Sequence, residues 1–151
     1  MDNTPAIVAV EDTGIAHQVV HYGRARTVEE SAELQGIETA AMVKTLVVRR
    51  SENDFLFVLV SGDRSIDWAK LRGHLGVSRI SLPDAEEAKA VTGYERGTIT
   101  PFGSSTQWPI VMDERLSGSI AIGAGAHGVS IHIDADDLAR HFNADRADVT
   151  K

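Results

Sequence analysis

The chain has 151 residues, a hydrophobic fraction of 42% and a formal net charge of −7. This length suits one domain over 1–151, and the apolar content favours a packed core over wholesale disorder. The absence of cysteine excludes disulfides, thiolate metal sites and cysteine nucleophiles. A negative balance argues against a protein that grips long nucleic acid through a basic face, although it allows contact with a short single-stranded end.

Targeting signals are not apparent in the sequence. No apolar run approaches the length that crosses a bilayer, and the N-terminal residues lack the basic and then apolar pattern of a signal peptide. A chain without cysteine also fits a reducing compartment. We therefore expect a cytoplasmic protein that makes no membrane contact.

The first part of the chain predicts two capped helices and a hairpin. Thr4 can cap a first helix that stops at Gly14, and Thr27 and Glu30 have the capping-box spacing before a stop at Gly36. The expected elements are a helix over 3–14, a strand over 16–22, a helix over 27–36, and strands over 42–50 and 55–62 joined by a turn at 51–54.

The second part predicts three helices among short strands. Trp68, Leu71 and Leu75 form an apolar stripe at helical spacing, and Pro83 begins a helix that stops at Gly93. The expected elements are helices over 65–76, 83–93 and 134–142, strands over 77–82, 108–113, 119–123 and 129–134, a loop over 93–104, and a frayed polar tail after 142.

The order of these elements indicates the fold class. Strands and helices are interleaved, but the helices are few and several strands follow one another directly. The run at 55–62 is apolar at nearly every position, which is typical of a strand buried on both faces. We therefore predict a mixed α/β fold in which helices pack on a mixed sheet, not a regular βαβ series.

The glycine-rich run GAGAHG, at 123–128, matches the dinucleotide pattern G-x-G-x-x-G. That pattern needs a helix to open at the glycines, but the strand 129–134 follows instead. We reject a dinucleotide site on this context. A hairpin turn, or a glycine loop that lets a ligand approach the backbone, explains the run better.

His17 and His21 lie four residues apart and are the strongest candidates for metal ligands. The segment predicts a strand, where that spacing separates the two side chains, and no third ligand is apparent nearby. We expect two partly exposed histidines and no metal.

Lys44 stands in a β-run that is otherwise apolar. A desolvated ammonium is costly unless an anion meets it, so Lys44 suits phosphate or ribose recognition, or stabilisation of a developing negative charge. The alternative is that the side chain extends from the strand to water. The residue types alone favour neither interpretation over the other.

The loop GTITP, at 97–101, is bracketed by Gly97 and Pro101. Glycine leaves its own amide uncovered, and proline fixes the direction of the exit. Such a loop can present N–H groups to a carbonyl oxygen or a carboxylate, although most G-x-x-x-P segments are only turns.

Five segments, in this order, resemble the YbaK/EbsC family, also called the prolyl-tRNA synthetase-associated or insertion-domain superfamily. The similarity covers roughly residues 5–141, and its most specific marks are KTLVV and GTITP. The segments are TVEESAELQGIETAAMVKTLVV, FLFVLVSGDRSIDWAKLRGHLGV, VTGYERGTITPFG, PIVMDERL and IAIGAGAHGVSIHIDADDLA.

The resemblance implies a curved mixed β-sheet that forms a partial barrel with helices around it. It also implies a trans-editing deacylase, a hydrolase that cleaves the ester between a wrong amino acid and the 3′ end of a tRNA, commonly the tRNA for proline. Alanine, cysteine, serine and threonine are the candidate amino acids. The implied partner is the CCA end, with a synthetase as a further candidate, and no cofactor or metal is implied.

The resemblance also implies roles for named residues. Lys44 falls on the family's essential lysine and Gly97 on its G-x-x-x-P loop, and we expect both to be catalytic. The loop 97–101 would form the backbone wall around the aminoacyl group. The expected substrate-binding residues are Tyr22, Thr45, Ser61, Thr98, Ile99, Thr100, Pro101, Gly125 and His127.

The chemistry of an activated ester agrees with this assignment. A positioned water, main-chain donors at the carbonyl oxygen, a nearby cation and the tRNA's own ribose hydroxyl could suffice. A local basic patch around Lys44, Arg49, Arg50 and Arg96 would hold the tRNA end. The alternatives are a non-catalytic module that binds a tRNA end, a nucleotide or a partner protein, and a metal hydrolase that uses His17 and His21.

Overall fold

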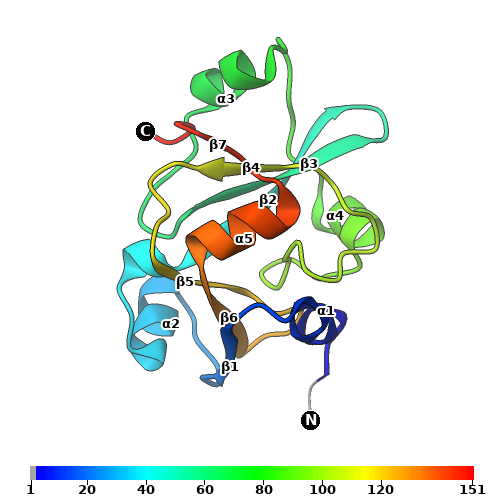
Figure 1. Ribbon diagram of the computed structural model, residues 1–151. Helices are drawn as coiled ribbons and strands as arrows, with labels where there is room; N and C mark the ends of the chain where they lie inside the picture. Colours follow the sequence, from blue (N-terminus) through cyan, green and yellow to red (C-terminus); the bar gives the residue numbers. More distant parts are fainter. Residues whose placement is uncertain (1–2) are drawn as a thin grey trace.

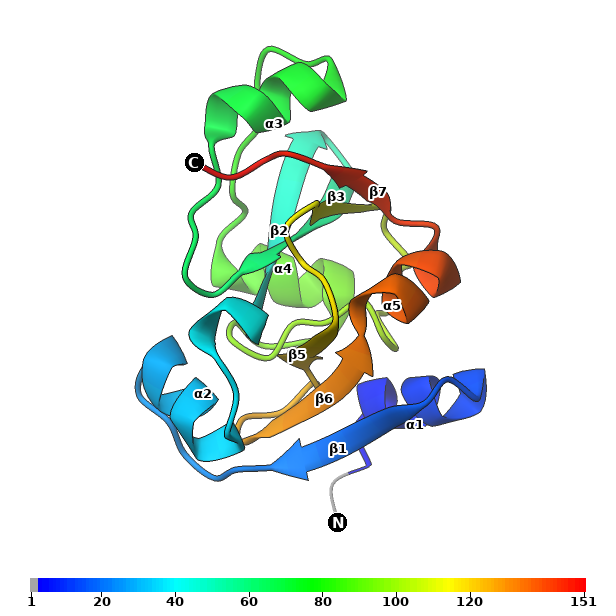
Figure 2. The same cartoon turned by 60° about the vertical axis from the view of Figure 1, so that its left-hand side comes forward.

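The computed structural model describes residues 3–151, which form two β-sheets with helices around them (Figures 1 and 2). This arrangement confirms the mixed α/β prediction. The helices are α1 (Pro5–Thr13), α2 (Val28–Gln35), α3 (Trp68–Leu75), α4 (Ala85–Thr92) and α5 (Ala135–Phe142), with a 3-10 turn η1 (Thr39–Ala41). The strands are β1 (His17–His21), β2 (Val43–Ser51), β3 (Asp54–Ser61), β4 (Ile110–Asp113), β5 (Ser119–Gly123), β6 (Val129–Asp134) and β7 (Asp145–Ala147).

Side-chain caps set the beginnings of the α-helices, and those of α1 and α2 are the predicted Thr4 and Thr27. Thr27 accepts a hydrogen bond from the Glu30 amide at 3.0 Å, and the Glu30 carboxylate accepts one from the Arg26 amide at 3.1 Å. The first bond satisfies a main-chain donor that the first turn of α2 leaves unpaired, and the second pairs the amide that precedes the N-cap. The N-caps of the other helices are Thr4, Asp67, Asp84 and Asp134.

The larger sheet has the strand order β2-β3-β4-β7. β2 and β3 form the predicted antiparallel hairpin, with Asn53 at φ 58° in its turn, whereas β3–β4 and β4–β7 are parallel. Residues 55–61 of β3 are all buried, which confirms the prediction of a strand covered on both faces. β2 is left as an edge strand, and this position matters for the site.

The smaller sheet is antiparallel, with the order β1-β6-β5. A single parallel bridge between Met42 and Ala121 joins it to β2, so the strands form two linked sheets and not a closed barrel. β6 leads directly into α5, which lies where the two sheets meet (Figure 2). The main core packs Leu138 of α5 with Phe57 of one sheet and Ile131 of the other.

The strand predicted at 77–82 is wrong. This segment is irregular, and its one β-bridge joins Ser81 to Arg49 of β2. The two residues exchange both main-chain hydrogen bonds, at 2.8 and 3.0 Å. The segment is short and pairs with the hairpin at one residue only, so it does not form a regular strand.

The frayed tail predicted after residue 142 is also wrong. β7 pairs with β4, and Val149 and Thr150 are fully buried. Asp113, itself fully buried, accepts hydrogen bonds from the Val149 amide at 3.1 Å and the Thr150 hydroxyl at 3.3 Å. The tail is therefore anchored by polar contacts that give no apolar pattern in the sequence.

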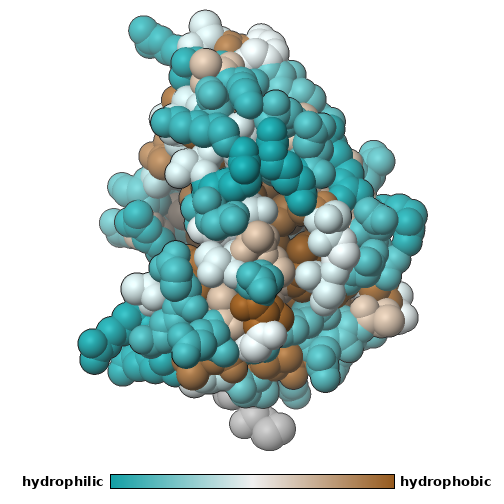
Figure 3. Space-filling view, turned by 90° about the vertical axis from the view of Figure 1, so that its left-hand side faces the viewer, coloured by the Kyte–Doolittle hydropathy of each residue, from teal (hydrophilic) through white to brown (hydrophobic). Residues whose placement is uncertain are grey.

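The face of the molecule in Figure 3 is largely hydrophilic, with apolar residues exposed near its centre. Over residues 3–151, none of the helices combines the length and the apolar character that a membrane span needs.

His132 of β6 gives a testable pH dependence of stability. Its Nε2 lies 2.8 Å from the side-chain oxygen of Gln35, and burial lowers its pKa below the ordinary 6.5. The unfolded chain therefore binds a proton at a higher pH than the folded chain does, and the free energy of unfolding falls as the pH drops below 6.5. We expect His132→Gln to lose less stability than the wild type over this range, in urea melts between pH 7 and 5. Parallel curves for the two proteins would contradict this.

Candidate active site

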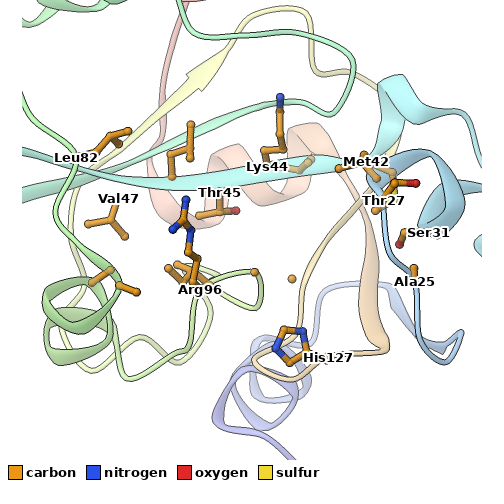
Figure 4. A pocket seen from close by; sticks show the side chains of 18 of the residues that line it. Ala25, Thr27, Ser31, Met42, Lys44, Thr45, Val47, Leu82, Arg96 and His127 are labelled. Atoms are coloured by element: carbon orange, nitrogen blue, oxygen red, sulfur yellow. The ribbon is translucent and has the colours of Figure 1, made fainter.

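A cavity of about 540 Å³ opens between the edge strand β2, the chain leading into α2 and the loop before Ile99 (Figure 4). Most of its wall is apolar, with a few hydroxyl and cationic groups among the apolar side chains. Its lining residues are Tyr22, Ala25, Arg26, Thr27, Val28, Ser31, Met42, Val43, Lys44, Thr45, Leu46, Val47, Leu82, Pro83, Ala85, Ala88, Arg96, Gly97, Ile99, Gly123 and His127.

The cavity runs along the free edge of β2. Residues 42–47 all line it. Successive side chains of a strand point to opposite faces of the sheet, so an unbroken run of lining residues indicates a cavity beside the edge of the strand and not over one face. Farther along, the N–H and C=O of Arg49 point outward to Ser81. Because main-chain directions alternate along a strand, the N–H and C=O groups of residues 43, 45 and 47 point outward at this same edge.

Thr45 contributes a polar group that the protein itself does not satisfy. Its Oγ1 is buried and has no hydrogen-bond partner within residues 3–151. A buried hydroxyl without a partner costs roughly 1–3 kcal/mol. Because Thr45 lines the cavity, a bound ligand is the natural partner for this hydroxyl.

Lys44 lines the cavity at its rim, but its ammonium does not face the loop 97–101. Side chains alternate along β2, and Figure 4 shows Lys44 extending to the side of the strand opposite His127. Its Nζ donates a hydrogen bond to the carbonyl of Arg64 at 2.6 Å. The ammonium therefore meets a main-chain carbonyl in the free protein, and two of its three donors remain available.

Only part of the loop 97–101, the predicted backbone wall, lines the cavity. Gly97 and Ile99 line the cavity, whereas Thr98, Thr100 and Pro101 are buried behind it. Gly97 has φ 90°, in the region that favours glycine, and a Cβ there would lie 3.5 Å from Cε1 of His127. Within residues 3–151 no hydrogen bond is donated by the main-chain N–H of Gly97, so this amide can bind a ligand.

The remaining predicted residues are split in the same way. Tyr22 and His127 line the cavity. Ser61 is buried in β3, where it pairs with Val43, and it does not reach the cavity. Gly125 lies behind the wall, where its N–H donates to the Thr98 carbonyl at 3.1 Å. The structure thus brings together Tyr22, Lys44, Thr45, Gly97, Ile99 and His127.

The charges of the cavity are all positive or neutral. Arg26, Lys44 and Arg96 line it, and no Asp or Glu of residues 3–151 does, although the chain carries a net charge of −7. The predicted basic patch is wrong in part, because Arg49 and Arg50 bond to the hairpin residues Ser51 and Asp54 instead. An anionic ligand fits such a lining.

Sequence reasoning missed the side of the cavity built by residues 25–31. Thr27 was explained by its capping role, and Arg26 and Ser31 carry no motif. As for metals, His17 points its Nδ1 to the Ile15 carbonyl at 2.7 Å. No group of three or more potential metal ligands occurs within residues 3–151.

The comparison with known families decides the classification. The family of the aminoacyl-tRNA editing domain matches residues 23–141. The chain belongs to this family. The matched range includes every residue that lines the cavity beside β2 except Tyr22.

Relatives of this editing domain occur alone and inside larger proteins. This chain is 27% identical over 124 residues to EbsC of Enterococcus faecalis, and the match covers 81% of this chain and 76% of EbsC. EbsC is named as a candidate Cys-tRNA(Pro)/Cys-tRNA(Cys) deacylase. This chain is also 31% identical over 128 residues to the proline–tRNA ligase of Thermoanaerobacter sp. strain X514, covering 83% of this chain. The chain spans only 22% of the length of that ligase.

A solved structure has the same fold. The crystal structure of a candidate trans-editing enzyme for prolyl-tRNA synthetase superposes with a TM-score of 0.90 at 26% identity, covering 97% of this chain and 95% of that one. The fold is therefore that of a trans-editing domain, as the sequence resemblance implied.

Proposed function

We propose that the protein is a trans-editing aminoacyl-tRNA deacylase, which hydrolyses the ester between a wrong amino acid and the 3′ end of a tRNA. The tRNA for proline, carrying alanine, cysteine, serine or threonine, is the favoured substrate. The observation that carries this proposal is the cavity of about 540 Å³ beside β2, which is free of carboxylates and faced by main-chain donors, in a chain of the editing family.

The cavity offers what hydrolysis of an activated ester needs. Water attacks the carbonyl carbon, the bond to the ribose oxygen breaks, and that oxygen takes a proton, which leaves a free amino acid and an intact tRNA end. The negative charge that develops on the carbonyl oxygen is stabilised by main-chain N–H groups held in place before the reaction. The outward amides of Thr45 and Val47 and the N–H of Gly97 are the candidate donors.

Proton transfer needs no dedicated acid–base pair from the protein. Among the lining residues within 3–151, His127 is the only one with an imidazole, the side chain that most often acts as a general base. The ribose hydroxyl next to the ester is a second candidate. Either can accept the proton of the attacking water, since positioning already supplies much of the rate.

The setting of the reaction follows from the substrate. A deacylase of this size holds the CCA end of the tRNA and little else, which is compatible with an acidic chain. A synthetase partner would then supply selectivity for the tRNA body. We place the reaction in the cytoplasm, where aminoacyl-tRNA is made.

A deacylation panel tests the proposal. The purified protein is incubated with tRNA for proline charged with alanine, cysteine, serine, threonine or proline, and loss of the labelled amino acid is followed. We expect hydrolysis of at least one mischarged tRNA well above the buffer rate, and sparing of prolyl-tRNA. If every ester survives but the tRNA still binds, the protein is a binding module and the proposal fails.

Thr45→Val separates the role of the hydroxyl from that of the fold. Valine keeps the shape and removes the unpaired buried hydroxyl, so the free energy of unfolding should stay the same or rise by up to about 1 kcal/mol. Loss of one ligand hydrogen bond should lower kcat/KM for deacylation roughly tenfold. Urea melts and single-turnover deacylation measure the two effects. Unchanged kcat/KM would show that the hydroxyl does not serve the substrate.

A further inference from the structure

A second hollow of about 570 Å³ adjoins the first, where β1 ends and β6 begins. The amides of Tyr22 and Gly23 both donate to the carbonyl of Gly128, at 2.9 and 3.4 Å. A Cβ on Gly128 would lie 2.8 Å from the Gly23 carbonyl oxygen, so the two main chains are in close contact. The floor of this hollow is therefore fixed by backbone contacts. Its lining residues are His21, Tyr22, Gly23, Arg24, Ala25, His127 and Gly128.

The two cavities adjoin and share part of their wall. Tyr22, Ala25 and His127 line both of them. Gly97 lies next to His127, since a Cβ added to Gly97 would lie 3.5 Å from Cε1 of His127. A ligand that fills the first cavity and extends past His127 enters the second hollow.

The second hollow is also suited to an anion. His21, Arg24 and His127 line it, and no carboxylate of residues 3–151 does. Within the same range Arg24 forms no salt bridge, whereas Arg50, Arg115, Arg140 and Arg146 are each paired with an aspartate. An unpaired guanidinium binds phosphate through a planar fork of donors, and imidazole and phenol rings stack on bases.

We propose that this second hollow binds the nucleotide that precedes the terminal adenosine, with Arg24 and His21 at its phosphate. The inference rests on the proposed function, because it places the aminoacyl end in the first cavity. The enzyme then recognises a polynucleotide end and not a lone aminoacyl-nucleoside. Arg24 and His21 are binding residues in this account and take no part in the chemical step.

The test compares a substrate that carries that phosphate with one that does not. One is a mischarged tRNA, and the other is the same amino acid on the 3′ oxygen of adenosine, which lacks any phosphate. For Arg24→Ala and His21→Ala we expect kcat/KM for the tRNA, divided by that for the aminoacyl-adenosine, to fall about tenfold. The slope of log Kd for tRNA against log salt concentration should also decrease in Arg24→Ala, by the amount that corresponds to about one phosphate contact. Arg49→Ala is the matched control, since it removes the same charge from a residue that lines neither cavity.

Each outcome decides between the two proposals. An unchanged ratio in Arg24→Ala, or a ratio that falls as far in Arg49→Ala, overturns the second site. If the wild type hydrolyses neither substrate, the proposed function fails, and binding of an uncharged CCA oligonucleotide decides the second site by itself. Arg24→Ala should then raise the Kd of that oligonucleotide about tenfold relative to Arg49→Ala, and an equal Kd overturns the inference.

Discussion

Lys44→Ala is expected to lower kcat/KM for deacylation by about 10²-fold or more, the size of effect seen when one charge-stabilising group is lost. Lys44 lines the cavity from β2, and its ammonium lies on the side of that strand opposite His127. In the free protein it binds the Arg64 carbonyl at 2.6 Å, which holds it half-buried without a carboxylate partner. A substrate phosphate or developing oxyanion can recruit its remaining donors.

The controls for Lys44 separate charge from folding. Lys89→Ala removes the same charge from the exposed side of α4, where Lys89 lies 3.6 Å from Glu95, and should leave kcat/KM nearly unchanged. Lys44→Arg keeps the charge and should recover part of the activity, limited by the different shape of the head group. Steady-state kinetics with a mischarged tRNA, next to thermal melts, measure both. Full activity in Lys44→Ala would remove Lys44 from the site.

Asp113→Ala is expected to have the largest effect on stability. The carboxylate is fully buried, pairs with Arg115 at 3.1 Å and accepts the Val149 and Thr150 hydrogen bonds described above. Removal of one partner of a buried ion pair lowers the free energy of unfolding by about 3–5 kcal/mol. The lower figure applies here because the Arg115 side chain is 35% exposed. For a domain of this size, 3 kcal/mol corresponds to a fall in Tm of roughly 6–12 °C.

The loss of Asp113 should also reach the cavity. Thr150 bridges to Ile66, and its hydroxyl accepts a hydrogen bond from Arg64 Nε at 2.8 Å, so the tail holds the segment whose carbonyl binds Lys44. Asp145→Ala is the matched control, because that carboxylate is 60% exposed and pairs only with His74 within residues 3–151. It should change the unfolding free energy by less than about 1 kcal/mol in urea melts. Equal melts for the two variants would contradict the account of the tail.

The sequence predicts those elements that carry local signals. The capping pair Thr27 and Glu30 locates α2, and the apolar run 55–61 identifies the buried β3. The strand β7 carries no such signal, because two of its three residues are charged, and the segment after it is held by Asp113, more than thirty residues away. Long-range polar contacts of this kind leave no periodic pattern in the chain.

The site shows the same division. The resemblance pointed to Lys44, Thr45, Gly97 and His127. These residues lie in three separate stretches of the sequence, which no local pattern connects. It did not give the direction of the Lys44 ammonium, which depends on the alternation along β2 and on the Arg64 carbonyl. Arg24 and Arg26 were missed because ordinary surface arginines become lining residues only when β1 and α2 are placed beside β2.

The most direct test of the central claim is a crystal structure with a non-hydrolysable substrate analogue, in which an amide joins the amino acid to the 3′ position of adenosine. The account predicts that the aminoacyl carbonyl oxygen lies within hydrogen-bond distance of a main-chain N–H of β2 or of Gly97, with the Thr45 hydroxyl engaged. An analogue bound elsewhere on the protein, with the cavity beside β2 left unfilled, would contradict it.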